Sequence, residues 1–189
     1  WYFVYEGEKM KKKKPIIFVI YGKARSGKNT ITDYIKEYYN NKNMKVIDLI
    51  YAESIKNYAQ KILNWDGSEE TKPREFLQQL GTEIIRNKID NNFFINRMLQ
   101  DIEVYSYFYD VIIIADARLK EEIEVPYNKY EKVIRIKIER NYSDLTEKQQ
   151  QHITETALNN YDKYDYKIIN NGTLEELRIK INNILDEVK

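Results

Sequence analysis

The chain has 189 residues, a formal net charge of +1 and no cysteine. This length supports one sizeable core with inserted lobes, and the near-neutral charge gives no case for a nucleic acid polymer or a membrane surface as partner. The lack of cysteine excludes disulfides, thiolate metal sites and a cysteine nucleophile, and no apolar run reaches the roughly 20 residues that span a bilayer. We therefore expect a soluble protein of the cytoplasm, or of the host cytoplasm if the sequence is viral.

The chain begins with a segment, residues 1–14, that we interpret as a tail. Met10 within it is a candidate natural start, and a basic run follows at Lys11–Lys14. A solvated basic patch and an upstream extension both account for these residues, and neither needs a function. We expect residues 15–189 to form a single domain.

Strand and helix patterns alternate along this domain. Continuous or alternating apolar runs predict five strands, at residues 16–21, 45–49, 110–115, 132–138 and 166–169. Apolar residues at helical spacing predict helices at residues 28–39, 52–63, 73–89 and 93–105. A last helix begins at Thr173, which forms a capping box with Glu176. This alternation predicts an α/β fold with a five-stranded parallel sheet and helices on both faces.

The loop between the first strand and the first helix has the sequence GKARSGKNT. Gly22 and Gly27 can adopt backbone angles that point successive amides at phosphate oxygens, and the following helix adds its positive end. Lys28 would bridge the terminal phosphates of a nucleotide. The alternative is a purely structural turn, but the flanking strand and helix favour a P-loop NTPase. The predicted nucleotide-binding residues are Gly22, Lys23, Ala24, Arg25, Ser26, Gly27, Lys28, Asn29 and Thr30.

Asn29 stands where the common form of this motif has a hydroxyl ligand of Mg²⁺. An amide oxygen is a poorer and bulkier substitute, whereas Thr30 does offer a hydroxyl. The sequence DVIIIADAR supplies a second candidate, because Asp116 comes at the carboxyl end of a buried strand, where ligands of parallel sheets bind. Arg118 follows with a planar fork suited to phosphate. We predict Thr30 and Asp116 as metal-supporting residues, although a carboxylate at this place can also be a simple helix cap.

Six motifs in chain order resemble those of the deoxynucleoside monophosphate kinases best known from bacteriophages and their bacterial relatives. They are GKARSGKNTITDYI, YAESIK, PREFLQQLGTEIIR, IIIADAR, HITETAL and YKIINNGTLEEL, and they run from about Ile16 to Ile184. The resemblance implies a nucleoside monophosphate kinase-like fold with an acceptor lobe and a lid. It also implies transfer of the γ-phosphate of ATP to a deoxynucleoside monophosphate with Mg²⁺. Asn29 departs from the Asp that is usual in the family, which puts the affinity for Mg²⁺ in doubt.

By this resemblance, residues 51–102 form the acceptor lobe, inserted between the second and third strands. Its Arg, Gln and Thr side chains can grip a monophosphate and read a base edge. The predicted substrate-binding residues are Lys56, Arg74, Gln78, Thr82, Arg86 and Glu155. A solvent-exposed helix face is the alternative for each residue of the lobe.

Residues 140–156 are polar and match the lid, in which Arg140 could stabilise the transferring group. We interpret His152 as a positioning residue of this lid. Asn170, Asn171 and Gly172 would lie near the adenine of ATP, or form only a turn into the last helix. The predicted catalytic residues are Lys28, Asp116, Arg118 and Arg140.

These residues predict direct in-line transfer from ATP without a phosphoenzyme. Two alternatives remain: another small-molecule P-loop kinase of the dephospho-CoA or phosphomevalonate type, and a noncatalytic nucleotide-binding regulator. The sequence leaves the formation of a homodimer open.

Overall fold

The computed structural model describes residues 11–140 and 157–188. Its centre is a parallel sheet of five strands in the order β2-β3-β1-β4-β5. The strands are β1 (Ile16–Tyr21), β2 (Val46–Leu49), β3 (Val111–Ala117), β4 (Val133–Glu139) and β5 (Tyr166–Ile169). The predicted strands and the parallel sheet are therefore confirmed.

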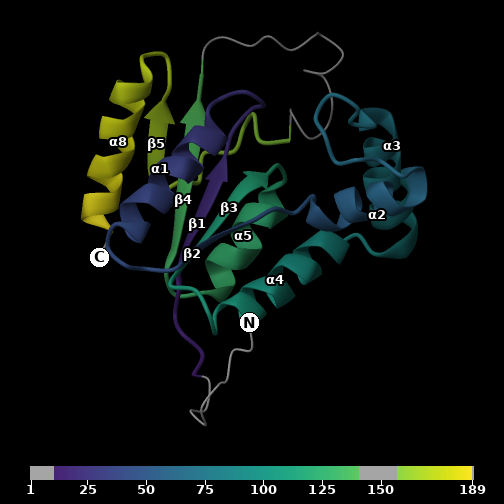
Figure 1. Cartoon of the computed structure of the whole chain (residues 1–189), viewed down its shortest axis with the longest axis horizontal. Helices are drawn as coiled ribbons and strands as arrows, with labels where there is room; N and C mark the ends of the chain where they lie inside the picture. The colour runs from purple at the N-terminus through teal and green to yellow at the C-terminus, as the bar shows by residue number, and fades with distance from the viewer. Residues whose placement is uncertain (1–10, 141–156, 189) are drawn as a thin grey trace.

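Helices cover the sheet on both faces (Figure 1). The helices are α1 (Lys28–Asn40), α2 (Glu53–Leu63), α3 (Arg74–Gln78), the π-helix η1 (Gln79–Ile89), α4 (Phe93–Tyr105), α5 (Lys120–Lys129) and α8 (Leu174–Glu187). On one face α1 and α8 pack side by side, and on the other α4 packs against α5 (Figure 1).

The central strand β1 shows why the sheet needs cover on both faces. Its residues from Ile17 to Ile20 are completely buried. Because side chains alternate along a strand, Ile17 and Val19 join the core on the α4–α5 side, whereas Phe18 and Ile20 join the core beneath α1 and α8. This apolar run therefore places the loop that follows β1 at the middle of the sheet edge.

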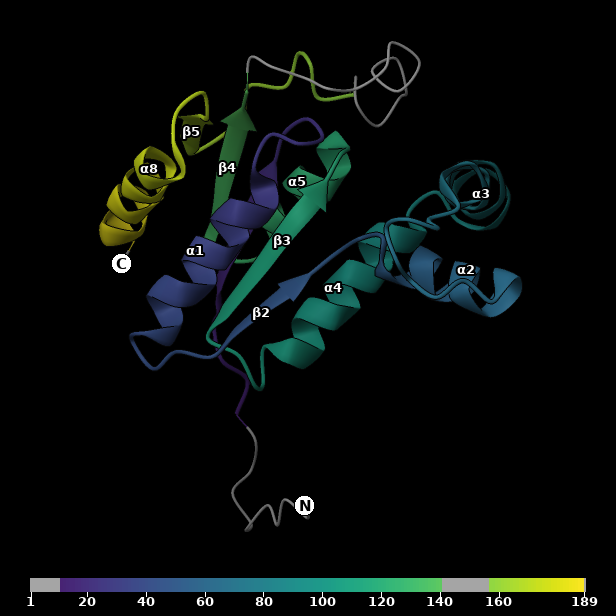
Figure 2. The same ribbon diagram turned by 45° about the horizontal axis from the view of Figure 1, so that its top comes forward.

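The chain leaves the sheet after β2 and returns to it at β3, and α2, α3, η1 and α4 lie in between. The two views agree that α2 and α3 lie at one side of the molecule and α8 at the opposite side (Figure 2). Ile55 of α2, together with Leu80 and Ile85 of η1, is buried in the same core cluster as Ile17 of β1. The segment predicted as an acceptor lobe is thus anchored to the main core.

Two elements differ from the prediction. The expected helix at residues 73–89 is divided into the short α3 and the wider-wound η1. The helix α5 has no counterpart in the prediction, because Pro126 lies inside it and a proline normally argues against a helix interior.

The described part of the predicted tail contacts the domain. Lys12 pairs with Glu103, Lys13 with Asp110 at 2.8 Å, and the Lys13 N–H donates to the Ser106 carbonyl at 2.8 Å. Within residues 11–140 and 157–188, no helix is long and apolar enough to cross a membrane.

Candidate active site

Part of the predicted site comes from loops that follow four different strands. The loop of residues 22–27 follows β1, Arg118 follows β3, Arg140 follows β4 and Asn170 follows β5. Because the strands are parallel, all four positions lie at the carboxyl edge of the sheet, where open α/β folds bind ligands. The topology therefore gathers residues that are distant in sequence.

The loop after β1 is shaped by backbone angles that most side chains disfavour. Gly27 has φ 109° and Arg25 has φ 60°. A Cβ at Gly22 would lie 2.2 Å from the carbonyl oxygen of Ile138, and one at Gly27 would lie 2.5 Å from Nδ2 of Asn170. The loop thus rests closely on the ends of β4 and β5, and only glycine fits at both positions.

Lys28 opens α1 and bends back across this loop. Its Nζ donates to the carbonyl oxygens of Gly22 at 2.8 Å and Lys23 at 2.7 Å. The buried Ser26 hydroxyl has no hydrogen-bond partner among the described residues. A cation, an unsatisfied hydroxyl and a helix N-terminus in one loop are suited to an anionic ligand.

Asn170 supports the loop from below. Its side chain is buried and its Nδ2 donates to the carbonyl oxygen of Ser26 at 2.8 Å. Asn171 and Gly172 are exposed in the turn before α8, and Thr173 caps that helix by accepting from the Glu176 N–H. Residues 170–172 therefore form the turn into the last helix that the sequence offered as an alternative. Contact of these residues with adenine stays a prediction.

Asp116 ties the end of β3 to the beginning of the lobe. Its Oδ1 accepts from the N–H of Tyr51 at 2.8 Å, and its Oδ2 accepts from the N–H of Ala52 at 3.0 Å. Burial raises the pKa of the Asp116 carboxyl above its ordinary value, while these bonds and the charges of Arg118 and Lys56 oppose the rise. The structure therefore brings Asp116, Arg118 and Lys56 together, and it gives Asp116 an anchoring contact to the main chain before α2 that the sequence did not predict.

A pocket of about 400 Å³ opens beside the phosphate loop. Four predicted residues line it: Gly22, Lys23, Arg118 and Arg140. Lys137 and Glu139 of β4, which the sequence analysis did not select, also line it, and Nζ of Lys137 lies 3.2 Å from Glu139 Oε1. The positive side chains make the pocket suitable for a phosphorylated ligand.

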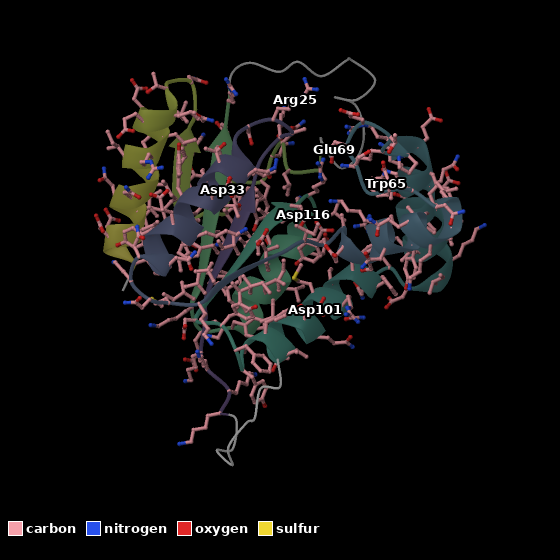
Figure 3. All side chains as sticks on the ribbon, in the orientation of Figure 1. Arg25, Asp33, Trp65, Glu69, Asp101 and Asp116 are labelled. Atoms are coloured by element: carbon pink, nitrogen blue, oxygen red, sulfur yellow. The ribbon has the colours of Figure 1, made fainter. Side chains whose placement is uncertain are left out.

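The lobe carries its own group of cations around Glu69. Arg74 Nη2 lies 3.2 Å from Glu69 Oε2, and Lys72 also pairs with this carboxylate. The hydrogen bond from Lys72 lowers the pKa of Glu69. The charge of Lys56 is close enough to contribute to this lowering. Figure 3 labels Glu69, Arg25 and Asp116 along the boundary between the lobe and the sheet. The structure thus places the predicted residues Arg74 and Lys56 in one cationic group around Glu69. Lys72 belongs to the same group, and sequence reasoning missed it.

Arg86 makes a different contact. Its Nη2 donates to Oε1 of the buried Glu122 at 2.9 Å, and its guanidinium lies over the Phe94 ring at 4.7 Å. Thr82 is half-buried and Gln78 is exposed. Binding of the acceptor by Arg86, Gln78 and Thr82 stays a prediction.

Glu122 is the buried charge that sequence reasoning missed. It lies in the first turn of α5, a helix that was not predicted because it contains Pro126. The residue before this helix is Leu119, whose side chain cannot accept a capping hydrogen bond. The one available signal was that Glu122 stands three residues after Leu119, the residue before the helix, where the second half of a capping box would be.

The predicted metal residues Thr30 and Asp116 come from different elements, α1 and β3. In the described part of the chain, no group of three or more His, Cys, Asp or Glu is arranged to hold a metal. Asn29 is exposed at the start of α1 and Thr30 is half-buried beside it. Glu155, His152 and the predicted lid beyond Arg140 lie outside the described residues.

Comparisons with known proteins agree with this arrangement. The family model for deoxynucleotide monophosphate kinase matches residues 38–181. The structure of the Mycobacterium tuberculosis APS kinase CysC in complex with AMPPNP and APS is similar, with a TM-score of 0.55 and 11% identity over 93% of this chain and 99% of that one. A putative kinase from Chloroflexus aurantiacus has a TM-score of 0.52 and 10% identity, over 95% of this chain and 100% of the other. No curated protein matches the chain.

The structural neighbours show the P-loop kinase fold, which confirms the predicted fold class. The family match begins at residue 38, after the phosphate loop, so the loop geometry and the family model are separate observations. The match spans more than half of the chain and includes the lobe, Asp116, Arg118 and Asn170. The chain therefore belongs to the deoxynucleotide monophosphate kinase family.

Proposed function

We propose that the protein transfers the γ-phosphate of ATP in line to the phosphate of a deoxynucleoside monophosphate, without a phosphoenzyme. The bond between the γ-phosphorus and its bridging oxygen breaks, an acceptor phosphate oxygen forms the new bond, and ADP and a deoxynucleoside diphosphate leave. The observation that carries this proposal is the phosphate loop beside a pocket lined by Lys23, Arg118 and Arg140, in a chain of this family. Such a transfer needs positioning and positive charge more than acid–base chemistry.

On the donor side, Lys28 would move from the carbonyls of Gly22 and Lys23 to the β- and γ-phosphates. A phosphate oxygen is a stronger partner for an ammonium group than a neutral carbonyl, so the exchange is favourable. The amides of the loop and the end of α1 would hold the remaining charge. Asn170, Asn171 and Gly172 would border the adenine.

Thr30 and Asp116 would support Mg²⁺. Each Asp116 oxygen accepts one backbone hydrogen bond, which leaves a lone pair for a water of the metal, and Mg²⁺ usually keeps several waters in kinase sites. When bound, the ion would neutralise charge on the β- and γ-phosphates. With an amide at Asn29 in place of a carboxylate, the ion would depend more on those phosphates.

On the acceptor side, Lys56 and Arg74 would bind the monophosphate. They surround the Glu69 carboxylate, and a phosphate offers the same oxygens with more charge. Gln78 and Thr82 would contact the nucleoside, and Arg118 and Arg140 would lie between donor and acceptor. Glu155 of the predicted lid would complete the acceptor site.

Lys28→Ala tests the donor side. We expect the variant to fold and to lose activity by roughly 100-fold or more, since Lys28 would act on charge that grows during transfer. The measurement is a coupled ADP assay with ATP, Mg²⁺ and every deoxynucleoside and nucleoside monophosphate.

Lys36→Ala is the matched control, because Lys36 lies on the same helix and pairs with Asp48 at 2.6 Å on the surface. It should retain the parent activity. Equal activity of Lys28→Ala and the parent would refute the site assignment. Binding of ATP by the parent with no product from any acceptor would refute the transfer itself and favour a regulator.

A further inference from the structure

Glu122 is a buried carboxylate that connects two separate parts of the site. Its side chain is 3% exposed. Oε1 accepts from Arg86 Nη2 of η1 at 2.9 Å, and Oε2 accepts from the N–H of Arg118 at 2.7 Å and of Leu119 at 3.2 Å. One oxygen therefore faces the lobe and the other faces the loop that carries Arg118.

Capping of α5 explains only half of this arrangement. A side chain at the first turn can satisfy the N–H groups of Arg118 and Leu119 without any contact to a residue 36 positions earlier. A buried carboxylate also costs free energy unless it is paired. Burial raises the pKa of Glu122, and the charge of Asp116 raises it further, whereas Arg86 opposes the rise. The ion pair to Arg86 is therefore not needed for capping α5, and it joins η1 to this helix.

The partner Arg86 is held from two sides. Its side chain is 19% exposed and its guanidinium stacks over Phe94 at 4.7 Å while it pairs with Glu122. A guanidinium fixed by a ring and a carboxylate loses the freedom to swing. Arg86 therefore gives η1 a defined position relative to α5.

The beginning of the lobe is tied to the same place. The Tyr51 hydroxyl donates to the main-chain oxygen of Glu122 at 2.6 Å, and the Tyr51 N–H donates to Asp116. Tyr51 is buried. The lobe is consequently fastened to the β3–α5 segment at two places, at Tyr51 where it starts and at Arg86 in η1.

We infer that Glu122 is a positioning residue for the acceptor side, which holds Arg86 of the lobe and the main chain of Arg118 in one geometry. An acceptor bound to the lobe is thereby presented to the pocket that Arg118 lines. Glu122 acts through these two residues and does not itself touch the substrate. The inference rests on the proposed function. It adds the contact that aligns the acceptor, bound to the lobe, with Arg118 in the pocket.

Glu122→Gln in the full chain tests the inference. The amide keeps an oxygen for the Arg118 N–H but turns a donor toward Arg86, so the ion pair is lost and the cap is kept. With ATP and each of dAMP, dCMP, dGMP and dTMP, we expect the KM of the acceptor to rise about tenfold and the KM of ATP to change less than about twofold. Glu121→Gln, an exposed neighbour on the same turn, should match the parent.

A double-mutant cycle separates positioning from simple loss of structure. Arg86→Met removes the ion pair from the other side, and the double variant should raise the KM of the acceptor no more than either single change. Circular dichroism checks that both single variants and the double variant are folded, as the cycle requires.

The inference is overturned if the KM of the acceptor stays at the parent value, if the KM of ATP rises equally, or if the two changes are additive. A parent that phosphorylates none of the four acceptors refutes the proposed function, and the inference falls with it. An active parent with an unchanged Glu122→Gln variant refutes the inference alone.

Discussion

At the scale of single residues, the phosphate loop depends on contacts from outside itself. Gly22 lies against the carbonyl of Ile138 and Gly27 against the side chain of Asn170. Asn170 also holds the Ser26 carbonyl, from 144 positions later in the chain. The shape of the loop is therefore set by the ends of β4 and β5 as well as by its own glycines.

Asn170→Ala should loosen this loop. Loss of the donor leaves the Ser26 carbonyl unsatisfied in a buried place, so we expect the free energy of unfolding to fall by about 1–3 kcal/mol. The KM of ATP should rise more than the KM of the acceptor. Urea denaturation and steady-state kinetics measure the two effects.

The control for this change is Asn183→Ala on the exposed side of α8, which should alter the free energy of unfolding by less than about 0.5 kcal/mol. If Asn170→Ala loses stability but keeps the KM of ATP, Asn170 has no part in nucleotide binding.

At the scale of elements, apolar residues at helical spacing predicted α1, α2 and α4, and a capping box predicted the start of α8. Helix α8 begins at the predicted Thr173, with both halves of the capping box present. Helix α5 escaped prediction because Leu119 precedes it and Pro126 interrupts it. There the cap is supplied by Glu122, whose charge is balanced by Arg86 from another element, and such a partner has no local signal.

Thr173→Ala should destabilise α8. The hydroxyl accepts the Glu176 N–H at 3.2 Å, and loss of such a cap costs about 0.5–2 kcal/mol. Thermal or urea unfolding gives the free energy, and Thr173→Ser, which keeps the hydroxyl, should remain close to the parent. Equal losses in both variants would contradict the capping role.

At the scale of the whole molecule, the sheet order places β1 between β3 and β4 and so brings Arg118, Arg140 and the phosphate loop to one pocket. Two carboxylates, Asp116 and Glu122, are enclosed where the lobe joins the sheet, and burial raises the pKa of each. Because each binds its proton more tightly in the folded state, each contributes stability at low pH that is lost as the pH rises through the raised pKa.

This linkage predicts a pH dependence of stability. The free energy of unfolding of the parent, minus that of Glu122→Gln, should be largest below pH 4.5, the ordinary pKa of glutamate, and should fall as the pH rises above it. Urea titrations at a series of pH values measure this difference. The same series with Glu121→Gln should show no such fall. A difference for Glu122→Gln that rises with pH would mean that the folded protein favours the charged form of Glu122.

The sequence alone determined the alternation of strands and helices, the place of the phosphate loop and the family. Each of these is local: an apolar run such as Ile16–Tyr21, a glycine spacing such as Gly22 to Gly27, or a motif read within a few residues. Only the tertiary structure decided that Asn170 supports Ser26, that Asp116 anchors Tyr51 and that Glu122 pairs with Arg86. Those contacts join residues from different elements, and a buried polar group is satisfied by whatever donor the packing of the chain brings beside it.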